Sequence, residues 1–99
     1  MAEIQVVSWR DIPAQVKARQ DRQRAARGLD PRFQEAVDAA AMRAGLTDTD
    51  DYLAEWRTSA WEERPGSPEH AADQRAAELE AEYSPERLRL LVDNGGREL

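Results

Sequence analysis

Few residues of this chain have side chains that could carry out catalysis or hold a metal ion. His70 is the only histidine and there is no cysteine, whereas a zinc site needs three or four converging ligands. A serine nucleophile needs a base within hydrogen-bond reach, and His70 is the only conventional base for the four serines. The numerous carboxylates suit helix faces on which they pair with arginines. The sequence therefore predicts no catalytic residue, no metal site and no cofactor, and we expect the protein not to be an enzyme.

A short motif at the end of the first hydrophobic segment has the composition of a recognition patch. It comprises Trp9, Arg10, Asp11 and Pro13, with Gln15 close behind. Trp and Arg are the residue types most enriched at the energetic centres of protein interfaces, which makes this motif a candidate partner-binding surface. The alternative interpretation is a strand-ending turn that places Trp9 in the core and pairs Arg10 with an acidic side chain.

A basic segment follows this motif. Residues 17–32 contain six basic and two acidic side chains, Arg22 and Arg24 among them. Such a segment could bind an acidic partner or phosphates, but no aromatic residue interleaves its charges, so a stacking platform for nucleic-acid bases is missing. The alternative is docking on the acidic second half of the chain or plain solvation. The complete set of candidate partner-binding residues is Trp9, Arg10, Asp11, Pro13, Gln15, Arg22 and Arg24.

The overall charge argues against a general nucleic-acid role. The 99 residues carry a net charge of −6, divided into +2 over residues 1–44 and −8 over residues 45–99. Phosphate binding needs a positive surface. The apolar run near the start, Val6-Val7, is too short for a signal peptide or a membrane span. We therefore expect a soluble, cytoplasmic protein.

The first half of the chain should contain the elements that position the recognition motif. Residues 3–9 are β-branched and aromatic with partial alternation, which predicts a strand. Pro13 interrupts this pattern, and residues 13–18 then fit either a second strand or a helix that begins at this proline. Asp30 and Pro31 predict a helix over residues 31–44, which Gly45 ends.

Three further helices are expected. One begins near residues 47–49 and places Leu53, Trp56 and Ala60 on its inner face, while Trp61 beyond it is only a weak candidate for a partner contact. Residues 64–68 contain two prolines and one glycine and predict a linker. After it, Ser-Pro-Glu at residues 67–69 and again at 84–86 supplies a capping hydroxyl, a first-position proline and a first-turn acid for two helices.

These segments together resemble a small bacterial family, the virulence factor domain. The resemblance starts with Trp-Arg-Asp-Ile-Pro-Ala-Gln-Val at residues 9–16 and covers most of the chain through residues 32–38, 40–45, 51–53, 55–57, 79–83, 86–88 and 94–96. It implies no catalytic residue, and it implies strands at residues 13–18 and roughly 22–29, although the composition of residues 17–27 favours a helix. It also suggests an association with one-carbon enzymes that use folate or corrinoid.

We therefore expect one α+β domain over residues 1–99, with a short N-terminal antiparallel sheet or hairpin packed with about four helices. A mostly helical fold is the alternative. The expected parts are a strand-containing basic segment at 1–29, two helices at 30–63, the linker at 64–68 and two acidic helices at 69–96. The expected function is that of a non-enzymatic accessory or regulatory protein that binds a protein partner. The alternatives are a small subunit of a folate- or corrinoid-dependent methyl-transfer or reductase enzyme and, ranked below it, a nucleic-acid-binding protein.

Overall fold

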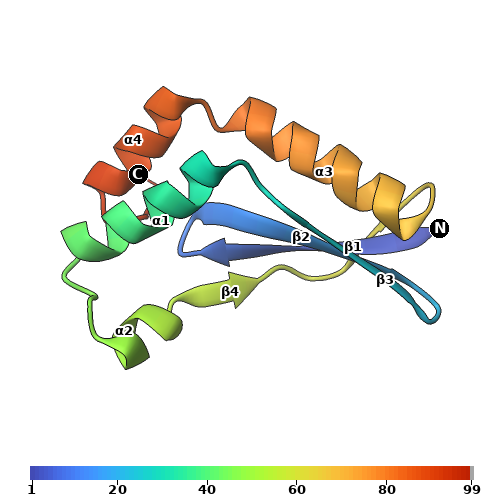
Figure 1. Cartoon of the computed structure of the whole chain (residues 1–99), viewed down its shortest axis with the longest axis horizontal. Coiled ribbons are helices and arrows are strands. Elements are labelled where there is room, and N and C mark those ends of the chain that lie inside the picture. Colours follow the sequence, from blue (N-terminus) through green and yellow to red (C-terminus); the bar gives the residue numbers. More distant parts are fainter. Residues whose placement is uncertain (99) are drawn as a thin grey trace.

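The computed structural model describes residues 1–98 and has the α+β fold that the sequence predicts (Figure 1). Within these residues, five strands form one antiparallel sheet and four helices accompany it, so the mostly helical alternative is wrong. The elements in chain order are β1 (Ala2–Trp9), β2 (Ile12–Gln20), β3 (Gln23–Gly28), α1 (Pro31–Arg43), α2 (Thr49–Leu53), β4 (Trp56–Thr58), β5 (Glu62–Arg64), α3 (Pro68–Glu82) and α4 (Pro85–Asp93).

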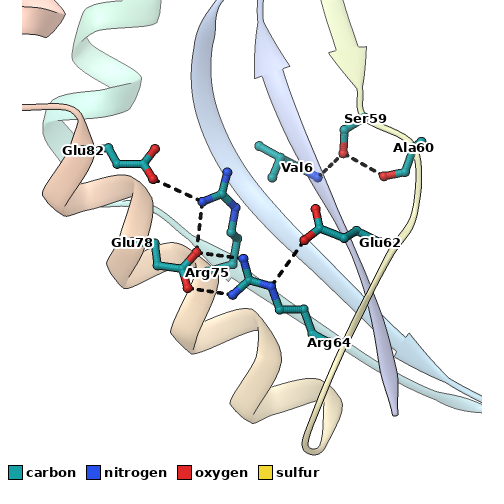
Figure 2. Close-up of polar contacts among 8 residues, drawn as sticks. All are labelled: Val6, Ser59, Ala60, Glu62, Arg64, Arg75, Glu78 and Glu82. Atoms are coloured by element: carbon teal, nitrogen blue, oxygen red, sulfur yellow. Dashed lines mark hydrogen bonds and ion pairs between the residues drawn. The ribbon is translucent and has the colours of Figure 1, made fainter.

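The sheet is centred on β1 and β2. β1 pairs with β2 and β2 pairs with β3, and each hairpin closes through a two-residue turn. β4 and β5 pair one after the other with the remaining edge of β1, so β3 lies at one edge of the sheet. Ser59 continues the ladder between β4 and β5 (Figure 2). Its N–H donates to the Val6 carbonyl and its hydroxyl accepts from the Val6 N–H, both at 2.9 Å.

α1, α3 and α4 lie on one side of the sheet (Figure 1). α3 packs across β1, β2 and β3, where its small alanines approach the buried Ile4 and Val16. α1 packs against β2 and α4, and Phe33 of α1 and Leu91 of α4 join Trp9 in a second buried cluster. α2 is short and precedes β4 at one end of the molecule, so no helix of residues 1–98 covers the middle of the opposite sheet face (Figure 1). We call this opposite face, formed by β1, β2 and β3, the uncovered face.

The predicted start signals of the longer helices are confirmed. The side chains of Asp30, Ser67 and Ser84 each accept a hydrogen bond from an N–H of the first turn of α1, α3 and α4 respectively. Each of these helices has a proline in its first turn, where the missing N–H costs no intrahelical hydrogen bond. These local signals fix where the helices begin and how they enter the helical layer.

The basic segment forms strands despite its helix-favouring composition. The strands expected at residues 13–18 and roughly 22–29 are present as β2 and β3. Val16 and Ala18 are fully or almost fully buried under α3, while Lys17 between them is exposed. Helix propensities differ by only about 0.7 kcal/mol among ordinary residues, so burial of one face and pairing with β1 decide the outcome.

The expected helix through Trp56 is wrong. α2 ends after five residues, and Trp56–Thr58 forms β4 instead. The edge of β1 would otherwise leave backbone N–H and C=O groups unpaired, and an aromatic and a β-branched residue at the ends of this short segment favour a strand. Trp56 therefore lies opposite Trp9. Leu53 is 55% exposed and Ala60 is exposed, so neither belongs to an inner helix face.

Candidate functional site

The candidate residues fall on two hairpins. The β1–β2 turn holds Arg10 and Asp11, with Trp9 at the end of β1 before it and Pro13 in β2 after it. The β2–β3 turn holds Arg22, Arg24 follows in β3, and Gln15 lies in β2 between the turns. Both turns have a first residue with positive φ, 51° at Arg10 and 55° at Asp21, which is the left-handed region that two-residue hairpin turns use. The two turns thus have the same kind of backbone, but their surroundings differ.

Trp9 belongs to the core of the protein. Its side chain is fully buried, its indole N–H donates to the Tyr52 carbonyl at 2.9 Å, and its ring stacks on that of Tyr52 with 5.8 Å between centroids. Gly96 also lies against the indole, since a Cβ built there would come within 2.9 Å of a ring carbon. Pro13 is buried as well. Both side chains therefore support the β1–β2 turn from inside.

The charged groups of the same turn bond to other parts of the chain. Arg10 donates to the Glu55 carboxylate at 2.8 Å and to the Gly95 carbonyl at 2.9 Å. The hydrogen bond from Arg10 is the main cause that lowers the pKa of Glu55. The Asp11 carboxylate accepts from the Glu98 N–H at 2.7 Å. This geometry matches the alternative interpretation, a strand-ending turn with Trp9 in the core and Arg10 paired with an acidic side chain. The turn also anchors the C-terminal segment.

The β2–β3 hairpin places alternate side chains on the uncovered face. Residues directly opposite one another in antiparallel strands have side chains on the same face. Lys17 lies between Gln5 of β1 and Ala26 of β3, and Arg19 lies opposite Arg24. These residues form a row of polar and basic side chains beside small ones. Of the residues predicted from the sequence, Gln15 and Arg24 belong to this face, and Arg22 is exposed in the turn beside it.

A shallow hollow of about 560 Å³ opens on the uncovered face, and Trp61 lines it together with Gln5, Lys17 and Arg24. The Arg19 guanidinium lies over the Trp61 ring, 3.8 Å from its centroid, a favourable cation–π geometry. From the sequence, Trp61 is only a weak candidate for a partner contact, because it lies near the proline-rich linker with nothing to indicate what surrounds it. The signal that could have placed it is the pair of short strands on either side, which lays residues 59–61 along β1.

Positive charge on this hairpin is in excess. Within residues 1–98, Lys17, Arg22 and Arg24 form no ion pair. Arg24 also lies opposite Arg19, and like charges in directly opposed positions are destabilising. Glu3 compensates only Arg19, at 3.0 Å. A bound anionic group would therefore relieve a repulsion that the fold leaves in place.

Arginines on the helix-covered side of the sheet are partnered instead (Figure 2). Arg64, the last residue of β5, donates to both carboxylate oxygens of Glu78 in α3, at 2.7 and 2.8 Å. Arg75 donates to the same carboxylate at 3.0 Å. The hydrogen bonds from Arg64 chiefly lower the pKa of Glu78 to about 2. The segment expected as a linker at 64–68 is thus held to α3 at its first residue.

The chemistry available on the uncovered face is that of binding an anionic group through guanidinium, ammonium and amide donors. The part of the chain that the structure describes contains no group of three or more His, Asp or Glu side chains that could hold a metal ion. His70, the only histidine, is exposed in the first turn of α3. In the same residues, no helix combines the length and apolar composition needed to cross a membrane.

Comparison with known proteins gives one match. No curated protein and no solved structure matches the chain. A family model described as "Virulence factor" matches residues 7–92, from the end of β1 to the last turn of α4. This range includes both hairpin turns, α1, α2, α3 and all of α4 except its last residue, and it confirms the resemblance that begins at residues 9–16. The chain belongs to the virulence factor family.

Proposed function

We propose that this protein is a non-enzymatic accessory or regulatory module that binds an acidic segment of a protein partner on its uncovered face. The observation that carries this proposal is the group of three basic side chains, Lys17, Arg22 and Arg24, that have no acidic partner within residues 1–98 and lie on or beside a hollow lined by Trp61. Charge-assisted hydrogen bonds from such groups to carboxylates are about twice as strong as neutral ones. An acidic segment supplies the charge that the hairpin lacks.

A protein partner fits this face better than a nucleic acid. One side of the Trp61 ring is covered by the Arg19 guanidinium, so a base could not stack there without displacing that arginine. The net charge of −6 also repels a long polyanion. Gln5 and Gln15 add amide groups to the same face, and an amide can both donate to and accept from a peptide backbone.

The β1–β2 turn has a supporting part in this proposal. Trp9 and Pro13 hold the start of β2 in the core, and Arg10 and Asp11 fasten the turn to the C-terminal segment. Because β2 carries Lys17, these residues position the binding surface from behind. We therefore assign contact with the partner to the β2–β3 hairpin and positioning to the turn.

The test is selection from a phage-displayed library of random dodecapeptides on the immobilised protein at physiological salt. Recovered peptides should be rich in Asp and Glu. The double variant Lys17→Ala/Arg24→Ala should bind them at least about tenfold more weakly, the effect of losing about 1.4 kcal/mol. Arg43→Ala/Arg89→Ala is the matched control, because both arginines are exposed, on α1 and α4, and form no ion pair within residues 1–98.

Two results would contradict the proposal. Recovered peptides without an acidic bias, whose binding is unchanged in Lys17→Ala/Arg24→Ala, would show that the uncovered face is not the binding surface. Tighter binding of a single-stranded oligothymidine than of any recovered peptide, with affinity falling steeply as salt rises, would favour a nucleic-acid partner instead.

A further inference from the structure

The outer edge of β3 has backbone groups that no neighbouring strand uses. β3 is the last strand in the order β3-β2-β1-β4, and the Leu29 N–H directly after it donates to the Ala14 carbonyl of β2 at 3.1 Å. In an antiparallel ladder, residues alternate between bonding to one neighbour and facing the other way. The backbone N–H and C=O groups of Arg24, Ala26 and Gly28 therefore point away from β2, towards the open edge.

This edge lacks most of the features that prevent strand pairing. β3 contains no proline, and its register with β2 runs without the irregularity that interrupts the register of β1 with β2 between Val7 and Ser8. Five of its six residues are exposed. Charged side chains are the one protective device present, and both of them, Arg24 and Arg27, are positive.

The sign of these charges selects the kind of strand that the edge can accept. A second copy of β3 would bring like charges together, which is destabilising in opposed positions. A strand with carboxylates would place opposite charges side by side. The edge therefore disfavours self-pairing and favours an acidic partner.

The side chains around the edge define a pattern for the incoming strand. Every second residue would lie on the uncovered face, next to Arg24 and Ala26 and within reach of Lys17. Space is available there, because a Cβ built on Gly28 would meet no atom within 4 Å. The residues in between would lie on the helix-covered side, next to Ala25, which packs against the buried cluster under α3, and Arg27, which already pairs with Asp73 of α3 at 3.9 Å. Acidic residues fit the first set of positions and small apolar residues the second.

We infer that β3 is a strand-addition site that takes an extended segment in which acidic and apolar residues alternate. This inference rests on the proposed function and specifies its partner: the segment binds as a sixth strand, with main-chain hydrogen bonds to Arg24, Ala26 and Gly28. Main-chain pairing gives affinity in such complexes, and side chains at alternate positions give specificity. The carboxylates of the added strand neutralise Lys17 and Arg24.

The experiment is amide hydrogen exchange followed by NMR, with and without an acetylated octapeptide of alternating Glu and Val. The amides of Arg24, Ala26 and Gly28 should exchange at least about tenfold more slowly in the saturated complex. Those of Ala25 and Arg27, which already face β2, should change little. A peptide of the same composition with its glutamates grouped at one end serves as the control and should protect the three amides much less.

A variant sharpens the assignment. Ala26→Pro removes one outward N–H, and an edge strand tolerates a proline whose N–H side faces solvent. The variant should keep the fold, as seen in its NMR spectrum, and lose binding of the alternating peptide. Should the variant fail to fold, the exchange measurement on the unmodified chain decides alone.

Three results would overturn the inference, and a fourth observation separates its failure from failure of the proposed function. If the alternating peptide leaves the exchange of the three amides unchanged at millimolar concentration, strand addition is wrong. If acidic library peptides still bind in a way that depends on Lys17 and Arg24, docking on the uncovered face stands without it. Equal protection of the three amides by the grouped peptide would contradict the requirement that acidic and apolar residues alternate. Protection without any peptide, together with a dimer in sedimentation, would show that a second copy occupies the edge.

Discussion

The two hairpin turns of this protein share a backbone design and have opposite surroundings. Each has two residues, and the first of them has a positive φ. At the β1–β2 turn, Arg10 reaches Glu55 and Gly95, and the C-terminal segment lies over the turn. At the β2–β3 turn, the segment 17–28 has five basic side chains and one acidic one, and three of the basic side chains form no ion pair within residues 1–98. Other segments of residues 1–98 supply bonding partners for the charged side chains of the β1–β2 turn, but not for those of the β2–β3 turn.

This difference shows what separates a structural arginine from a binding arginine in a small domain. Residue type does not separate them, because both turns contain arginine and aspartate. What separates them is whether a segment later in the sequence places a carboxylate or a carbonyl beside the arginine. Glu55, Gly95 and Glu98 form hydrogen bonds with the β1–β2 turn. Trp61 lies beside the other hairpin and offers it an aromatic ring without a charge.

The largest expected effect compares the two tryptophans of these regions. Trp9→Ala should lower the free energy of unfolding by about 3–5 kcal/mol, because it leaves a cavity in the core and removes the bond to Tyr52. Trp61→Ala should cost only about 1 kcal/mol, the value of a partly exposed cation–π contact. Urea unfolding followed by circular dichroism measures both. Equal costs would mean that Trp61 is as much a part of the core as Trp9.

A glycine substitution at the first residue of each turn isolates the side-chain contribution, because glycine adopts positive φ freely. Arg10→Gly should lower the free energy of unfolding by about 1–3 kcal/mol, since it removes hydrogen bonds to a carboxylate and leaves the Gly95 carbonyl without its donor. Asp21→Gly should change it by less than about 0.5 kcal/mol. The measurement is again urea unfolding, and a large loss in Asp21→Gly would contradict the contrast between the turns.

The same contrast explains what the sequence could and could not predict. Capping signals are local, so the starts of α1, α3 and α4 follow from Asp30, Ser67 and Ser84. The strand at Trp56–Thr58 is decided by the free edge of β1, which lies far away in sequence, and a local pattern could not favour it over a helix. For the same reason, the local pattern of residues 13–18 fits a strand or a helix, and only the family resemblance favours the strand that the structure has there.

The candidate site also divides into residues that local composition identifies and residues whose place depends on distant segments. Gln15, Arg22 and Arg24 belong to a basic segment that composition identifies, and they lie on the uncovered face or in the turn beside it. Trp9 has the composition of an interface residue, yet a domain with few large apolar residues needs it in the core. Trp61 joins the site only through the pairing of β4 and β5 with β1.

Lowering the pH should reduce the stability contributed by the partnered charges, and the unpartnered basic side chains should not contribute to this change. Arg10 and Arg64 lower the pKa values of Glu55 and Glu78 below the ordinary value of 4.5, to about 2 for Glu78. A carboxylate whose pKa is lowered in the folded state stabilises the fold at pH values above its unfolded-state pKa. This stability is lost as pH falls through the folded-state pKa. Unfolding free energy should therefore decline from pH 4.5 towards pH 2. Because the Glu78 side chain is 37% exposed, solvent screening keeps its share below about 1 kcal/mol.

Matched variants assign this pH dependence. Glu78→Gln should flatten the decline of unfolding free energy between pH 4.5 and 2, and Arg10→Gly should flatten the part due to Glu55, because the hydrogen bond that lowers its pKa is gone. Lys17→Ala should leave the slope unchanged, since Lys17 has no carboxylate partner within residues 1–98. Thermal or urea unfolding over this pH range measures the slopes. A flatter slope in Lys17→Ala would reveal an acid paired with the hairpin.

At Arg24, a small gain in stability should accompany a complete loss of binding. Arg24→Glu replaces the like-charge pair with Arg19 by an opposite-charge pair, and should raise the free energy of unfolding by roughly 0.2–1 kcal/mol. The same substitution should abolish binding of acidic peptides, because it places a carboxylate where the partner's carboxylate must lie. Arg43→Glu on α1 is the control and should leave binding intact. A variant that loses binding while gaining stability would show that the fold keeps this repulsion for its partner, since a purely structural arginine would give the opposite sign. Unchanged binding would remove Arg24 from the site.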